Sequence, residues 1–82
     1  MSKELIDAMV GMKEQDAILI SKDLVEKGTD PMEIFSACRA AMDIVGKRFE
    51  KGEFFLPELM MAGEMLRQIS EIIKPLMKGE AK

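Results

Sequence analysis

The chain lacks most of the residues on which small enzymes depend. Its 82 residues include no histidine, no tryptophan and no tyrosine, and only one cysteine, Cys38. Without histidine there is no Ser-His-Asp or Cys-His nucleophile pair, no Glu-x-x-His di-iron site and no zinc site of the mixed cysteine and histidine kind. A single cysteine forms neither an internal disulfide nor a Cys-x-x-Cys pair. We therefore expect a non-catalytic chain with no catalytic residue and no metal site.

The charge and hydropathy patterns argue against two further classes of protein. The 12 lysine and arginine residues are interleaved with 15 aspartate and glutamate residues, so no basic stripe is available for nucleic acid. The apolar runs reach only four residues, too short for a membrane span or a signal peptide. Together with the unpaired cysteine, these features predict a cytoplasmic protein that binds neither nucleic acid nor membrane.

Glycine and proline divide the chain into segments with helical periodicity. Four helices are expected at about 2–10, 13–27, 31–52 and 57–76. Asp30 and Pro31 are typical of a helix start, and Gly28 suits the left-handed position after a helix. Pro75 predicts a kink or a loosened final turn, and the polar residues 78–82 are expected to fray. Short connections favour an all-α fold, a small four-helix bundle that forms a single domain over residues 1–82.

The start of the last helix departs from this regularity. Before Pro57, where a polar capping residue is usual, the chain has Phe54, Phe55 and Leu56, so we expect an uncapped helix start. Local rules are usually violated at functional sites, which makes residues 52–59 a candidate surface. Alternatively, the three side chains turn inward as a hydrophobic staple, and periodicity alone favours this second arrangement.

Methionine is unusually frequent, with nine in the chain. Met60 and Met61 must point about 100° apart on a helix, so we expect one of them to face away from the core. Methionine here either contributes to an adaptable apolar surface or, as is more common, fills gaps in the core. Cys38, by contrast, lies on the apolar stripe of the third helix and is interpreted as a small buried hydrophobe.

Three carboxylates, Glu50, Glu53 and Glu58, lie close to the apolar run. They could form a hard-cation site or an acid/base pair. Lysine and arginine side chains are interleaved with them, so we interpret the group as a solvated rim of mixed charge.

The segment between Val45 and Met60 contains the pattern Phe-x-x-Gly-x-x-Phe-Leu-Pro. With Asp30-Pro31 before it and Lys74-Pro75-Leu76 after it, this segment resembles the helical N-terminal domain of corrinoid proteins. These proteins are the small cobalamin carriers of methyltransferase systems, and cobalamin-dependent methionine synthase has the same helical module. The resemblance spans essentially the whole chain.

The resemblance implies a role for particular residues. In this family the helical domain covers the upper face of the corrin ring and shields the methyl group on cobalt. Matching positions imply that Phe49, Leu56 and Leu59 face the upper ligand, with Phe55 and Met60 as neighbours or supports. The cofactor implied is cobalamin, contacted on its upper face only.

The resemblance also implies partners. The family's lower cobalt ligand is a histidine in the Asp-x-His-x-x-Gly motif of a Rossmann-like cobalamin-binding domain, and this sequence contains no histidine. We therefore expect that domain either in the same parent chain or in a separate protein. We favour the first arrangement, in which this chain is an excised domain. Methyltransferase subunits are expected as further partners. The alternative is a small helical interaction or dimerisation module with a Phe/Met surface and no cofactor.

Overall fold

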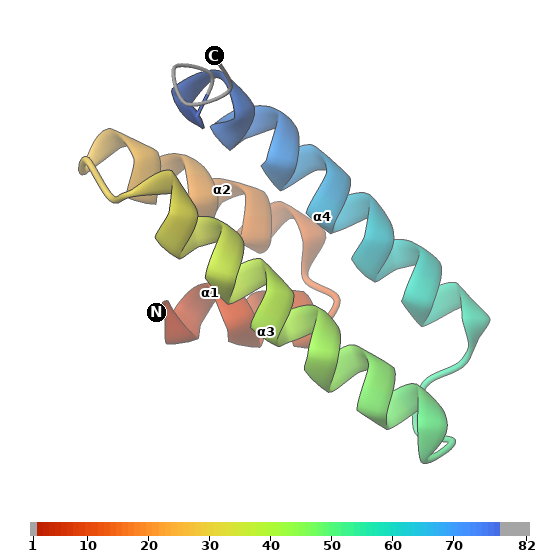
Figure 1. The fold of residues 1–82 in the computed structure, drawn as a ribbon. Helices are drawn as coiled ribbons and strands as arrows, with labels where there is room; N and C mark the ends of the chain where they lie inside the picture. Colours follow the sequence, from red (N-terminus) through yellow and green to blue (C-terminus); the bar gives the residue numbers. More distant parts are fainter. Residues whose placement is uncertain (1, 78–82) are drawn as a thin grey trace.

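The computed structural model describes residues 2–77, which form four α-helices and no strand (Figure 1). The helices are α1 (Lys3–Val10), α2 (Glu14–Glu26), α3 (Pro31–Glu50) and α4 (Leu56–Met77). Their bounds lie within two residues of the expected ones, and the all-α four-helix prediction is confirmed. Helix α4 continues past Pro75 to Met77, while the predicted fraying of 78–82 lies outside the described residues.

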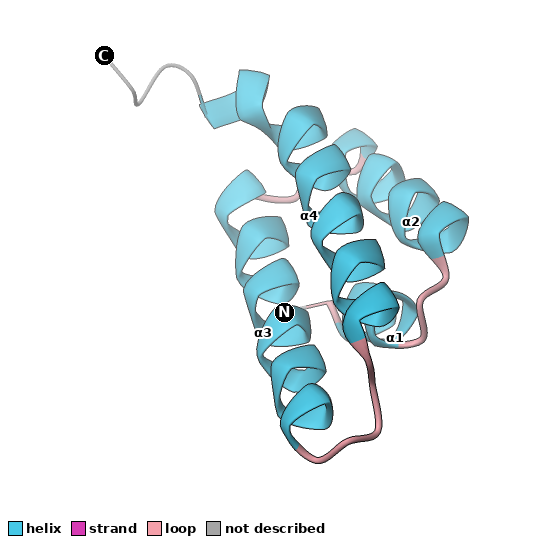
Figure 2. Ribbon diagram, turned by 90° about the vertical axis from the view of Figure 1, so that its right-hand side faces the viewer, coloured by secondary structure: helices cyan, strands magenta, loops and turns pink. Residues whose placement is uncertain are grey.

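The helices differ strongly in length. Helix α1 has 8 residues, α2 has 13, and the antiparallel pair α3 and α4 have 20 and 22. Helix α3 packs against α1 and α4, and α2 packs against α1 and α4. In both ribbon views the corner that joins α3 to α4 extends beyond the connection between α1 and α2 (Figures 1 and 2). The end of α3 and the start of α4 therefore extend beyond the connection between the two shorter helices (Figures 1 and 2).

The core lies where all four helices overlap. The large fully buried side chains include Leu5 and Met9 of α1, Ile34 of α3 and Met65 of α4. Cys38 is also fully buried among them, so its interpretation as a buried hydrophobe is confirmed. Burial disfavours the charged thiolate and raises the pKa of this thiol to about 11.

The helix ends explain the agreement in bounds. The Asp30 side chain accepts a hydrogen bond from the Met32 amide at 2.9 Å, as expected for an N-cap. Helices α2 and α3 are each followed by a glycine with positive φ, +85° at Gly28 and +81° at Gly52. After α1 the left-handed residue is Met12, with φ +61°, rather than the preceding glycine. Its half-buried side chain packs against the core.

None of the helices described for residues 2–77 combines the length and the apolar content needed to cross a membrane.

Candidate functional site

Large exposed apolar side chains are concentrated at the α3–α4 corner. Five of the eight found among the described residues lie between positions 49 and 61. Four of them, Phe49, Phe55, Leu56 and Met60, were predicted as site residues, and we refer to these four as the corner patch. Met60 is 70% exposed and Phe55 is 65% exposed. The fifth, Met61, is also exposed but points about 100° away from Met60 around the helix.

The exposure follows from the lengths of the helices. Eight residues of α1 rise about 12 Å, whereas the 20 residues of α3 rise about 30 Å. On α4, Leu56 and Met60 are one turn apart and lie opposite the buried residues Met65 and Ile69. The corner patch therefore faces outward because of the architecture, and it does not fill a gap in the core.

The chain between α3 and α4 is tightly ordered by hydrogen bonds. The amides of Gly52, Glu53 and Phe54 donate to carbonyl oxygens in the last turn of α3, at 2.9–3.2 Å. The Phe55 amide donates to Glu58 Oε1 at 2.9 Å. Each amide of the connection thus has a partner within the corner, which fixes the backbone that presents the patch.

The bond to Glu58 corrects the expectation that α4 has an uncapped start. Glu58 is the third residue of the helix, and its carboxylate accepts from the residue before the helix, as in one half of a capping box. The sequence interpretation assigned Glu58 to a charged rim and missed this bond. The spacing of three residues between Phe55 and Glu58 was the signal that could have revealed it.

The adjacent aromatic residues take opposite directions. Phe54 is half-buried and packs against the core, and the Arg48 guanidinium carbon lies 5.7 Å from its ring centroid. Phe55 and Leu56 are exposed. The inward arrangement that periodicity favoured is therefore right for Phe54 and wrong for the next two residues. Leu59, predicted to face the ligand, is half-buried and also packs against the core.

Charged side chains border the patch on both helices. Arg48 Nε lies 4.0 Å from a carboxylate oxygen of Glu53 beside the loop. Further along the outward face of α4, Arg67 Nη2 lies 2.6 Å from Glu64 Oε2. Hydrogen bonds from Arg67, and then from Gln68, lower the pKa of the Glu64 carboxyl. Among residues 2–77, no three metal-ligating side chains are placed to share an ion.

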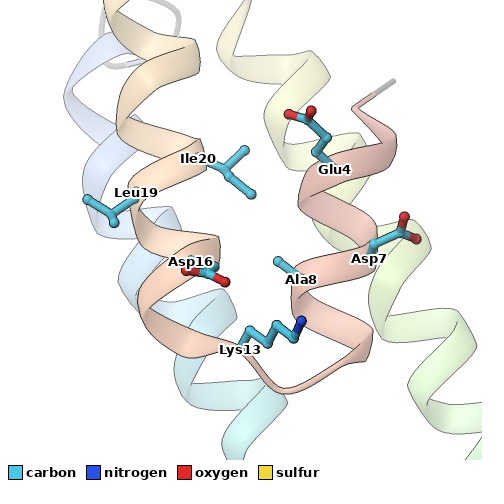
Figure 3. A pocket seen from close by; sticks show the side chains of 7 residues that line it. All are labelled: Glu4, Asp7, Ala8, Lys13, Asp16, Leu19 and Ile20. Carbon is cyan, nitrogen blue, oxygen red and sulfur yellow. The ribbon is translucent and has the colours of Figure 1, made fainter.

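A separate hollow of about 340 Å³ lies between α1 and α2 (Figure 3). Glu4, Asp7 and Asp16 contribute carboxylates to its lining, and Lys13 contributes an ammonium group. Leu19 lies at its edge on the outer face of α2. This hollow shares no residue with the corner patch, so the patch stands as a surface of its own.

Comparison with known proteins shows the family of the chain. Residues 1–74 match the family described as the B12 binding domain. The chain belongs to this family. The family predicted from the motif between Val45 and Met60 is thereby confirmed, and with it cobalamin, that is vitamin B12, as the cofactor of the family.

The relatives of this B12 binding domain include proteins named for methylamines. It is 34% identical over 73 residues to trimethylamine corrinoid protein 1 of Methanosarcina acetivorans, covering 88% of this chain and 34% of the relative. It is 38% identical over 76 residues to dimethylamine corrinoid protein 1 of the same organism, covering 92% of this chain and 35% of that protein. The chain thus spans about a third of the length of these relatives. No solved structure matches it significantly.

The chemistry of the corner patch fits one side of a cobalamin. Its four side chains are apolar and carry no ionisable group, so they suit a small alkyl ligand and the carbon skeleton of a ring. The thioether of Met60 is flexible and polarisable, which suits an irregular apolar partner. The sequence contains no histidine, so these residues offer no imidazole ligand to cobalt. The residues present fit an apolar contact with the cofactor and not the ligation of cobalt.

Proposed function

We propose that this domain is the helical cap of a corrinoid protein and that its corner patch covers the upper face of methylcobalamin. The observation that carries the proposal is a group of exposed apolar side chains on a corner whose loop amides are all hydrogen-bonded. An ordered apolar surface of this kind contributes little to the fold that bears it. Its burial against a partner supplies the free energy of contact.

The patch acts by contact and by exclusion of water. Bound cobalamin supplies the cobalt that carries a methyl group between partner methyltransferases. Phe49 on α3 and Leu56 on α4 present hydrocarbon from the two walls of the corner, so water is displaced from the upper face without a hydrogen bond being offered to the methyl group. Phe55 and Met60 widen this contact on either side of Leu56. The domain itself performs no bond-making step.

The proposed partners follow from the restriction of this domain to the upper face of the cofactor. A Rossmann-like cobalamin-binding domain supplies the lower ligand and most contacts to the corrin. The names of the relatives point to methylamine methyltransferase systems, whose methyltransferase subunits are the proposed further partners. A cap without histidine is consistent with this arrangement, because it offers cobalt no imidazole ligand.

A chimera tests the proposal. In dimethylamine corrinoid protein 1 of M. acetivorans, the segment that matches this chain is exchanged for it, and the photolysis rate of bound methylcobalamin is measured. We expect slower photolysis than in the same protein with the segment deleted. Phe49→Ala and Leu56→Ala should each restore faster photolysis, because each opens the cover over the methyl group.

A matched control is available on α2. Leu19 is 63% exposed and Leu56 is 61% exposed, but Leu19 lies away from the corner, so Leu19→Ala should leave the photolysis rate unchanged. The proposal fails if Phe49→Ala and Leu56→Ala behave like Leu19→Ala while the domain stays folded. Self-association through the patch in the absence of any corrinoid would instead favour an interaction module.

A further inference from the structure

Two glycines occupy the interiors of the long helices, Gly46 in α3 and Gly63 in α4. A Cβ atom built on either one meets no atom within 4 Å beyond its chain neighbours and the adjacent turns of its own helix backbone. The other described glycines differ in kind, because Gly28 and Gly52 have positive φ and a Cβ on Gly11 would meet a backbone oxygen at 3.1 Å. Neither packing nor backbone conformation requires a glycine at position 46 or 63.

Both glycines weaken the fold. Glycine within a helix is less favourable than alanine because more backbone freedom is lost on folding. For a domain of this size, the difference corresponds to a melting temperature lowered by about 4–8 °C at each position. No contact within the bundle accounts for this loss of stability.

Both glycines border the corner patch. Gly46 precedes Phe49 by three residues, and Gly63 follows Met60 by three, so each is a neighbour of a patch residue on the helix surface. Gly46 lies four residues before the end of α3 and Gly63 seven after the start of α4. At 1.5 Å per residue they are about 6 Å and about 10 Å from the corner along the two axes.

We propose that Gly46 and Gly63 lack side chains so that the corrin ring can approach the α3 and α4 backbones beside the corner patch. The inference rests on the proposed function and extends the contact from the methyl group to the flat face of the macrocycle. A methyl group at either position would hold the ring away from the helix. A gap of about 0.5–1 Å already forfeits roughly a quarter to a half of the dispersion attraction between the two surfaces.

The test measures the stability of the domain and its shielding of the methyl group separately. Gly46→Ala and Gly63→Ala are made in the 82-residue chain, where melting is followed by circular dichroism, and in the chimera, where photolysis of bound methylcobalamin is followed. We expect each variant to raise the melting temperature by about 4–8 °C and to speed photolysis several-fold. Ser36→Ala, at an exposed position elsewhere on α3, is the control because it improves helix propensity away from the patch.

The outcomes distinguish this inference from the proposed function. A lower melting temperature in either glycine variant would show a structural role and overturn the inference. Unchanged photolysis in either variant would overturn it as well, while faster photolysis in Phe49→Ala would leave the cap function standing. If Phe49→Ala also has no effect, the proposed function fails with it. Faster photolysis in Ser36→Ala would show that helix stability, and not space for the ring, controls the cover.

Discussion

Two methionines on α4 provide a direct test of the distinction between patch and core. Met65 is fully buried and Met60 is 70% exposed, although they are only five positions apart. Methionine and glutamine have similar length and helix propensity, so Met→Gln changes mainly polarity at each site. At position 65 the substitution forfeits about 1.5–3 kcal/mol of apolar burial and leaves a buried amide unpaired at a cost of about 1–3 kcal/mol.

Met65→Gln should therefore lower the free energy of unfolding by about 2.5–6 kcal/mol. A domain of 82 residues has about 4–12 kcal/mol in total, so the loss takes a large share of its stability and, at the lower end of this range, leaves the variant partly unfolded at 25 °C. Met60→Gln should change the free energy by less than about 0.5 kcal/mol, as is usual for an exposed position.

Urea unfolding followed by circular dichroism at about 222 nm measures both values, with the m-value as a check that the two-state analysis holds. A loss of more than about 1 kcal/mol in Met60→Gln would refute the reasoning. It would mean that the corner patch holds the bundle together, and the proposed function would lose the observation on which it rests.

Three further predictions concern the thiol, the start of α4 and a turn. Burial raises the pKa of the Cys38 thiol from 9.0 to about 11, so the unfolded chain loses this proton first. Between roughly pH 9 and 11 the free energy of unfolding should therefore fall by about 1.4 kcal/mol per pH unit relative to that of Cys38→Ala. Below about pH 8 the two proteins should show the same dependence on pH. The free energies come from urea unfolding, and parallel curves for the two proteins over the whole pH range would contradict the burial effect. Glu58→Ala removes the acceptor of the Phe55 amide, so that amide should exchange faster by NMR and stability should fall by about 0.5–1 kcal/mol; unchanged exchange would exclude the cap. Gly28→Ala places a side chain at φ +85° and should cost about 1–2 kcal/mol, seen as a lower melting temperature, opposite in sign to Gly46→Ala.

The helices were predictable because their ends carry local chemical signals. Asp30 and Pro31 supply a start, and Gly28 and Gly52 supply left-handed residues, each of which acts over three or four positions of the chain. Met12 shows the limit of such signals. A methionine with φ +61° is tolerated there because its side chain packs against the core, and that packing depends on helices far away in sequence.

The direction of the corner side chains could not be predicted from periodicity. Three consecutive apolar residues at a helix start fit either the core or the surface, because no helical repeat has yet been established there. The outcome depends on how far α3 and α4 extend beyond α1, which is a property of the assembled bundle. Four of the five residues that the family resemblance places at the upper ligand are exposed, whereas Leu59 is half-buried and packs against the core. Their contact with a ligand stays a prediction.

The hydrogen-bonded corner has a consequence for how a bound ring would be uncovered. The amides from Gly52 to Phe55 are all paired within the corner, and Phe54 anchors the connection to the core. A hinged loop that opens by itself would have to break these bonds and withdraw an aromatic ring. In the proposed cap, access to the methyl group is therefore gained by displacement of the four helices as one rigid body, and the affinity of the patch for the ring sets the free energy of that displacement.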